Sequence, residues 1–296
     1  MKNTFSQMHP IVNFVFFAFV ISLSMFMLNP VCLVISLICG LLNAVYLNGK
    51  KAVRLSLLYL LPTIALISIV NPVFNHDGVT ILTYFPWNNP LTLESIIYGV
   101  ATAVLLSAVV LWFSCFNKVM TSDKFIYLFG RIIPSMSLIL SMALRFIPKF
   151  ISQFNVVRNT QKCIGRDISN GSPFQRLKHA AKIVSIMITW ALENAIETAD
   201  SMKSRGHGLK GRTAFSIYRF SKRDIITLVT IIIIGTSLVV MSMLKIAKFR
   251  YFPSVKGNVV SVTSIIYYIL YFVLMLIPLI INVREGAKWK RLRLAI

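Results

Sequence analysis

The sequence predicts an all-α integral membrane protein with about six transmembrane helices and long helices on the cytoplasmic side. Of its 296 residues, 56% are hydrophobic, against roughly 45–50% apolar residues in ordinary soluble domains. This excess lies in long uncharged runs, which a bilayer requires and a soluble core rarely contains. The formal net charge is +22, and the cations lie between and after the runs. This pattern predicts contact with anionic lipid headgroups and no binding of nucleic acid.

Six apolar runs have nearly the length of about 20 residues that a helix needs to cross about 30 Å of hydrocarbon. Pro62 in the third run is tolerated there if neighbouring helices satisfy the backbone groups that it frees. The expected spans are Ile11–Leu28, Val31–Leu47, Leu55–Val73, Ser95–Phe116, about Ile225–Leu244 and about Val259–Ile281.

The loops between the spans set the expected orientation. The loop with Lys50, Lys51 and Arg54 is basic, whereas the segment Phe74–Glu94 contains Asp77 but neither Lys nor Arg. Under the positive-inside rule the first loop is cytoplasmic and the second is external. Both termini are then cytoplasmic in a multi-pass protein of the cell membrane.

One loop disagrees with this orientation, because the count puts it on the external face although it is basic. It contains Lys245, Lys248, Arg250 and Lys256. The basic tail outweighs it, with Arg284, Lys288, Lys290, Arg291 and Arg293. We therefore divide the chain into the first four spans (1–116), a cytoplasmic-side region (117–224), and the last two spans with the tail (225–296).

The middle region contains about 18 of the 31 Lys and Arg residues. Its first apolar stretch, Phe125–Pro148, is interrupted by Arg131 and Arg145, which leaves roughly 20 Å of uncharged helix, too short to cross a bilayer. We expect a helix kinked near Pro134 and ended near Pro148.

A second stretch, Ile183–Ser204, predicts an amphipathic helix of about six turns. Its expected apolar positions are Val184, Ile188, Ala191, Ala195, Ala199 and Met202. Glu193, Glu197 and Asp200 line another face, where we expect them to pair with nearby cations. Arg205 followed by Gly206 is typical of a helix end in the left-handed conformation.

The segment Ala199–His207 resembles a short signature of the T components of energy-coupling factor transporters, in which Ala-Arg-Gly ends a coupling helix. Ser204 stands where that family has Ala, and Lys203 stands where it has Glu. About 40 residues earlier, Thr160–Asp167 resembles the first signature but has Ile164 in place of its Arg. Further similar stretches are Asn71–Gly78, Phe129–Arg131, Ser141–Pro148, Gln175–Arg176 and Lys222–Asp224.

The resemblance implies a non-catalytic coupling subunit that uses no cofactor. Its implied partners are two ABC-type ATPase subunits, which hydrolyse ATP, and a small membrane subunit that binds a vitamin or metal ion for uptake. The implied ATPase contacts are Ser204, Arg205 and Gly206 at the second signature. At the first they are Gly165 and Arg166, with Arg166 in place of the missing Arg.

Other chemistries find little support in the sequence. The cysteines Cys32, Cys39, Cys115 and Cys163 are scattered without metal-ligand spacing, and His76 with Asp77 is more typical of a turn than of a metal site. Gly206–Thr213 resembles a Walker A motif with Arg212 in place of Lys, but a helix is expected before it, where the motif needs a strand.

Two alternatives stay open. A stand-alone channel or secondary transporter normally carries ionisable groups or broken helices at the bilayer midplane, and the first four spans carry no charge there. A membrane-embedded enzyme acting on lipid substrates would need acidic metal-binding pairs near the end of a span, and the sequence offers none.

Overall fold

The computed structural model describes residues 4–49, 54, 58, 60–84, 90–130, 133–166, 169, 172–209, 218–257 and 261–294. Helices dominate these residues, as the sequence predicts for an all-α membrane protein. The chain forms two compact units. We call Met1–Phe125 with Tyr218–Ile296 the membrane unit, and Ile126–Ile217 the helix-pair unit.

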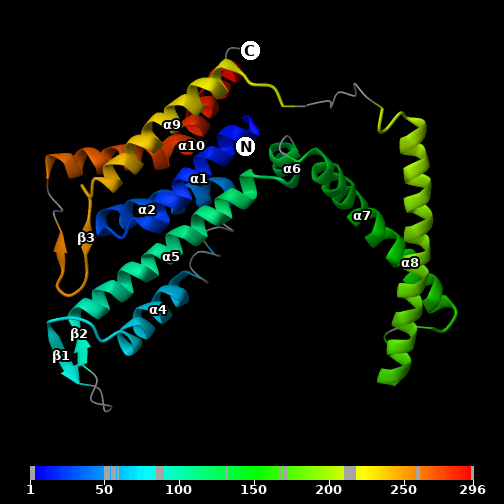
Figure 1. Cartoon of the computed structure of the whole chain (residues 1–296), viewed down its shortest axis with the longest axis horizontal. Coiled ribbons are helices and arrows are strands. Elements are labelled where there is room, and N and C mark those ends of the chain that lie inside the picture. Colours follow the sequence, from blue (N-terminus) through cyan, green and yellow to red (C-terminus); the bar gives the residue numbers. More distant parts are fainter. Residues whose placement is uncertain are drawn as a thin grey trace. The chain divides into compact units, whose positions relative to one another are not determined.

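The membrane unit contains one helix for each expected span (Figure 1). The helices are α1 (Pro10–Phe26), α2 (Pro30–Asn48), α4 (Leu61–Phe74), α5 (Leu93–Val119), α9 (Lys222–Met243) and α10 (Val262–Leu294). A short 3-10 helix, η1 (Phe5–Gln7), precedes α1, and α6 (Ser122–Gly130) follows α5. Antiparallel strand pairs lie before α5, with β1 (Ile81–Tyr84) and β2 (Pro90–Thr92), and before α10, with β3 (Phe249–Arg250) and β4 (Lys256–Gly257).

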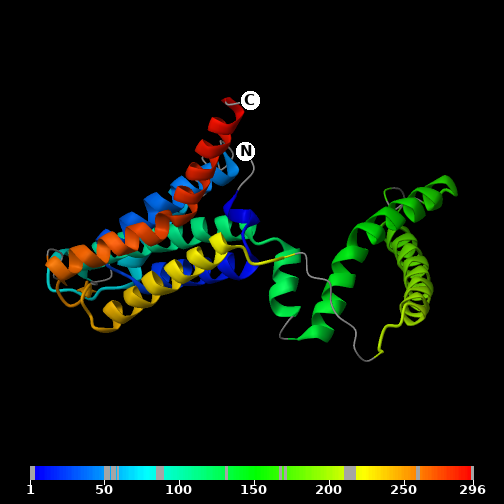
Figure 2. The ribbon, with the colours of Figure 1, turned by 90° about the horizontal axis from the view of Figure 1, so that it is seen from above.

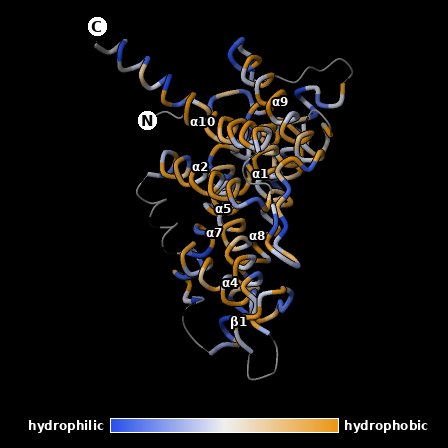
Figure 3. Tube along the Cα trace, turned by 90° about the vertical axis from the view of Figure 1, so that its left-hand side faces the viewer, coloured by the Kyte–Doolittle hydropathy of each residue, from blue (hydrophilic) through white to orange (hydrophobic). Residues whose placement is uncertain are grey.

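In the described residues, four helices are both long and apolar enough to cross a membrane, namely α2, α5, α9 and α10. The apolar helices α1 and α4 are shorter. Leu55–Leu57 of the third expected span lie outside the described residues. The count of six spans therefore stays a prediction, while each expected span coincides with a helix. Figure 3 shows the apolar colour along α2, α9 and α10, and hydrophilic residues at the C-terminal end of α10.

Short polar residues start α2 and α9 of the membrane unit. The Asn29 side chain accepts the backbone N–H of Val31 at 3.0 Å, and Pro30 occupies the first turn of α2. Ser221 and Asp224 form a reciprocal capping box at the start of α9. Such caps satisfy backbone donors that a helix leaves unpaired at its N-terminus.

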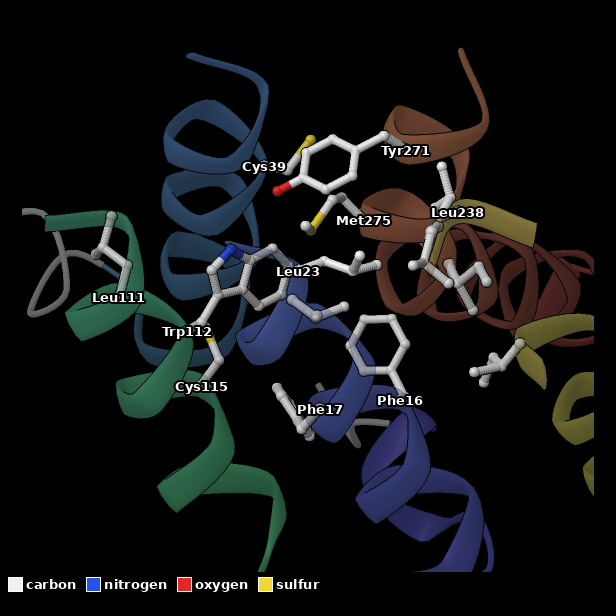
Figure 4. Packing of buried hydrophobic residues seen from close by; sticks show 14 of the residues in the cluster. Phe16, Phe17, Leu23, Cys39, Leu111, Trp112, Cys115, Leu238, Tyr271 and Met275 are labelled. Carbon is white, nitrogen blue, oxygen red and sulfur yellow. The ribbon is translucent and has the colours of Figure 1, made fainter. Parts of the chain in front are cut away.

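The core of the membrane unit forms where α1, α2, α5, α9 and α10 meet (Figure 4). Aromatic rings fill much of it, for example Phe16 and Trp112, whose ring centroids lie 6.2 Å apart with nearly perpendicular planes. Three of the four cysteines, Cys32, Cys39 and Cys115, are buried there, and Cys163 is exposed. The buried cysteines thus act as small apolar side chains, as the sequence predicts.

A buried hydrogen-bond network joins four of these helices through Ser36 of α2. The indole N–H of Trp112 on α5 donates to the Ser36 hydroxyl at 3.1 Å. Ser36 lies 2.8 Å from the Ser24 hydroxyl of α1, which lies 3.3 Å from the Tyr271 hydroxyl of α10. Since buried polar groups are costly without partners, this network fixes how the four helices pack.

Residues 75–80, which follow α4, form a turn that contacts the start of α5. The Asn75 side chain accepts the backbone N–H of Asp77 at 3.3 Å, which is the Asx turn that suits these residues. The buried carboxylate of Glu94 accepts the Thr80 hydroxyl at 2.7 Å. His76 and Asp77 therefore lie in a turn, and among the described residues no group could hold a metal ion.

Lys124 of α6 lies buried at the end of α5 in the membrane unit. Its ammonium group donates to the Val119 carbonyl at 2.9 Å and to the carbonyl of Ser6. Burial lowers the pKa of Lys124 to about 8. The Lys124 side chain therefore connects η1 to the corner between α5 and α6.

The helix-pair unit consists mainly of α7 (Pro134–Cys163) and α8 (Pro173–Ser204), which cross each other (Figure 1). The predicted helix end near Pro148 is wrong, because α7 continues through Pro148 to Cys163. Pro148 removes one backbone donor, but Phe150 and Val157 beyond it pack in the unit and hold the helix. Pro134 begins α7 and does not kink a continuing helix.

The predicted amphipathic helix ends at Ser204 as expected but begins earlier. It starts at Pro173, where Ser172 and Gln175 form a capping box. Apolar periodicity does not indicate this start, because residues 175–182 are mostly polar. The cap and the Pro at the first position are nevertheless signals of a helix start.

We predict that Ser36→Ala lowers the free energy of unfolding of the purified chain by about 1–2 kcal/mol, because Trp112 loses its buried acceptor. Chemical denaturation in a fixed detergent, followed by near-ultraviolet circular dichroism, measures this change. Ser107→Ala is the control, because the buried Ser107 hydroxyl bonds only to Ala103 of its own helix. An equal loss in both variants would contradict the role of the network between helices.

We also predict that the stability of the wild-type chain rises relative to Lys124→Met between about pH 8 and about pH 10.5. In that window the unfolded lysine binds more protons than the folded one, so unfolding becomes less favourable as pH rises. Thermal unfolding of both proteins across the window measures the difference. A difference that falls with rising pH would contradict the burial of the charged group.

Candidate functional site: two exposed helix ends

The C-terminal end of α8 forms a Schellman motif built by the second signature. Arg205 is the last residue of the turn, and Gly206 has a left-handed φ of 76°. The backbone N–H of Gly206 donates to Lys203 at 2.9 Å, and that of His207 donates to Met202 at 3.0 Å. These two bonds satisfy carbonyls that the helix end leaves unpaired. Gly206 is needed because other residues rarely adopt this conformation.

The side chains at this end face solvent in the isolated chain. Ser204 and Arg205 are exposed, and Gly206 is partly covered. The Ser204 hydroxyl donates back to the Ser201 carbonyl at 2.9 Å, so its proton is already bonded within the helix. In the described part of the chain, Arg205 forms no ion pair. Its guanidinium therefore remains available for a carboxylate of another protein.

The C-terminal end of α7, in the first signature, has the same backbone geometry. Gly165 has a φ of 79°, its N–H donates to Lys162 at 3.0 Å, and the Arg166 N–H donates to Gln161 at 2.9 Å. This is a second Schellman motif. The two predicted contact sites are thus matching structures, although their sequences differ.

The match of the two helix ends fixes which residues correspond. Ile164 occupies the position of Arg205, and Arg166 occupies the position of His207. Ile164 is 61% exposed, so the first end presents an apolar side chain where the second presents a cation. Arg166 is also exposed. It follows the left-handed glycine, whereas Arg205 precedes its own, so the cation of the first end is attached two positions later than that of the second end.

The structure does not bring the two ends together. Helix α8 has 32 residues and is therefore roughly 48 Å long. The eight residue steps from Gly165 to Pro173 reach at most about 28 Å. Gly165 and Arg205 are therefore separated by at least about 20 Å. They can serve only as two separate contact points.

An aromatic and cationic cluster connects α7 and α8. The rings of Phe150 and Trp190 pack edge to face with centroids 5.3 Å apart. The ammonium group of Lys149 lies 5.4 Å from the centre of the Trp190 ring and donates to the Asn194 side chain. These contacts between helices were not predicted. Apolar periodicity could indicate Trp190, but no pattern in the sequence pairs it with Lys149.

Within the helix-pair unit, the face of α8 with apolar side chains is largely uncovered. Val184, Ile188, Leu192 and Ile196 are each more than half exposed, whereas Ile183 is buried. The exposed residues lie four positions apart and form one continuous stripe along α8. Such a stripe needs lipid or a partner protein to cover it.

The acidic residues of α8 do not behave as expected. Glu193, Glu197 and Asp200 are exposed, and within the described part of the chain none of them forms an ion pair. The predicted pairing with nearby cations is thus absent, since exposed pairs gain too little to hold long side chains in place. In the Walker-like segment, Lys210–Thr213 lie outside the described residues, and a helix precedes Gly206 as expected.

We predict that Gly165→Val frays the end of α7, whereas Gly165→Asn leaves it nearly intact. No atom lies within 4 Å of a Cβ at this position, so the cost of Val is purely conformational, about 1–2 kcal/mol, and Asn tolerates left-handed backbone. Hydrogen exchange of the peptide covering 161–166 should be about tenfold faster in the Val variant. Equal exchange in the two variants would contradict the motif.

The chain matches the protein family CbiQ, described as cobalt transport protein, over residues 1–217. It is 26% identical over 215 residues to the energy-coupling factor transporter transmembrane protein EcfT 1 of Listeria monocytogenes serotype 1/2a, covering 68% of this chain and 77% of that protein. It is 28% identical over 207 residues to the EcfT of Brevibacillus brevis, covering 62% and 76%.

A shorter and more similar match is to the EcfT of Lactobacillus helveticus, 33% identical over 103 residues. It covers 34% of this chain and only 37% of that protein. The family match includes both helix ends described above and reaches to the end of the helix-pair unit. The chain therefore belongs to the CbiQ family of transmembrane transport proteins, the family resembled by its two signatures.

Proposed function

We propose that this chain is the coupling subunit of an energy-coupling factor importer. Two partner ABC-type ATPases supply ATP hydrolysis, and a small membrane subunit binds the vitamin or metal ion that is taken up. The chain itself transmits motion between them and catalyses no reaction. The observation that carries the proposal is the pair of matching, exposed helix ends in a chain of the CbiQ family.

Two contact points suit two ATPases. Each end has a left-handed glycine without a side chain, which allows a close approach to a groove in a partner. At the second end, Arg205 can pair with a carboxylate through two parallel hydrogen bonds. At the first end, Gly165 allows the approach, Ile164 offers an apolar contact, and Arg166 supplies the charge.

The uncovered stripe on α8 supports a contact with the substrate-binding subunit. Val184, Ile188, Leu192 and Ile196 offer apolar surface that a second membrane protein can cover. The same helix therefore carries an ATPase contact at its end and an apolar contact along its length.

The proposed mechanism is that of a lever. ATPase closure moves the ends of α7 and α8 near Gly165 and Arg205. The contacts at Trp190 link the two stiff helices, so this displacement makes α7 and α8 move relative to each other. The stripe on α8 then reorients the bound substrate-binding subunit. A long helix suits this task because its backbone hydrogen bonds keep it stiff between the two contacts.

We predict that Arg205→Glu reduces co-purification of the ATPases at least about tenfold, because it puts like charge opposite the partner's carboxylate. Amounts of ATPase recovered with the tagged chain from detergent-solubilised membranes measure the effect, with membrane expression unchanged. The control is Lys182→Glu, the same charge reversal at an exposed position within α8. Undiminished recovery with Arg205→Glu would count against the proposed contact.

The competing function is a stand-alone channel or secondary transporter. The purified chain reconstituted alone in liposomes distinguishes the two. Our proposal expects no substrate uptake without the ATPases, whereas uptake by the chain alone would favour the competitor.

A further inference from the structure

A positively charged cleft lies between α9 and α10 in the membrane unit. Its volume is about 720 Å³, and its walls come from the first turns of α9 and the last turns of α10. Figure 2 shows the two helices diverging toward this end. The family match ends at residue 217, so the cleft lies entirely outside the matched segment.

The cleft lies at the boundary of the hydrocarbon core. Helix α9 is uncharged from Ile225 to Met243, and α10 is uncharged from Val262 to Val283. At 1.5 Å per residue these stretches measure about 29 Å and about 33 Å, close to the thickness of the core. Arg223 and Arg284, just beyond them, therefore lie at the depth of the lipid phosphates.

The cations in the cleft outnumber the carboxylates. Arg223 lies 3.7 Å from Glu285, the carboxylate that lines the cleft. Arg284, Lys288 and Arg291 lie on one face of α10, because they are spaced by four and three positions. Within the described residues, none of these three forms an ion pair. Like charges at this spacing repel each other, and a bound anion would relieve the repulsion.

The wall of the cleft becomes apolar one helical turn toward the membrane core. Ile226 on α9 lies three residues beyond Arg223, and Ile281 on α10 lies three residues before Arg284, and both line the cleft. A soluble anion gains nothing from this apolar wall. A molecule with an anionic group attached to hydrocarbon chains contacts both parts of the cleft.

We propose that this cleft binds the headgroup of an anionic phospholipid. The lipid phosphate lies against Arg223, Arg284 and Lys288, and an acyl chain follows Ile226 and Ile281 into the membrane. Glu285 lies 3.7 Å from Arg223 and holds that cation in the cleft. The bound lipid thereby connects the ends of α9 and α10, which diverge here.

The test measures phosphatidylglycerol binding to the full chain, purified and delipidated in a neutral detergent, by native mass spectrometry. Phosphatidylcholine with the same acyl chains is the neutral comparison, and inorganic phosphate is the soluble competitor. We expect binding of phosphatidylglycerol in clear preference to phosphatidylcholine, with no displacement by inorganic phosphate at equal concentration.

The deciding variant is Arg284→Gln with Lys288→Gln, for which we expect about 25-fold weaker phosphatidylglycerol binding, from about fivefold for each cation. The matched control is Arg250→Gln with Lys256→Gln, which removes the same charges from an exposed strand pair at the other end of these helices. We expect the control to bind like the wild type.

Three results would overturn the proposal: equal binding of the two lipids, displacement by inorganic phosphate, or an equal loss of binding in the deciding variant and its control. If the double variant does not fold, Lys288→Gln alone gives a second reading. It should weaken phosphatidylglycerol binding about fivefold, and unchanged binding would equally overturn the proposal.

Discussion

The packing of the membrane unit depends on the partners of one buried hydroxyl, that of Ser36. It accepts the Trp112 indole N–H and lies within hydrogen-bond distance of Ser24, which in turn reaches Tyr271. Helices that pack in a lipid environment gain little from the hydrophobic effect, so close packing and polar contacts of this kind decide their arrangement. Because the network involves α1, α2, α5 and α10, it joins the first helices of the chain to the last. The ends of α9 and α10 that form the charged cleft are positioned by this same packing.

The helix-pair unit is held by different interactions. Only Val157 and Ile183 are buried among its described apolar residues, and the crossing of α7 and α8 relies on Phe150, Trp190 and Lys149. A pair of long helices with so small a core has large uncovered surfaces. Such a unit suits a part that works between other proteins, because its stability then increases on association. Its two Schellman ends are the best-defined features, since backbone hydrogen bonds determine them without help from distant residues.

Much of this could be predicted from the sequence, for reasons that are local. Each uncharged run coincides with a helix of the membrane unit, since the length of such a run depends mainly on bilayer thickness. Arg205 with Gly206 predicted the end of α8, because a left-handed glycine is a local requirement.

The extension of α7 beyond Pro148 could not be predicted, since contacts with α8 outweigh the lost hydrogen bond. The same applies to the pairing of Lys149 with Trp190 and to the cleft between α9 and α10, which depend on how distant segments pack. Glu193, Glu197 and Asp200 form no ion pair with the described residues, so charge proximity in sequence does not ensure ion pairs.

We propose that the chain works as the coupling subunit between ATPases and a substrate-binding membrane protein. The most direct test is a pull-down of the tagged chain from its native membranes in mild detergent, with the accompanying proteins identified by mass spectrometry. We expect to recover two ABC-type ATPase subunits and a small membrane protein, whose ligand then identifies the transported substrate. Recovery of the chain alone, under conditions that preserve other membrane complexes, would contradict it.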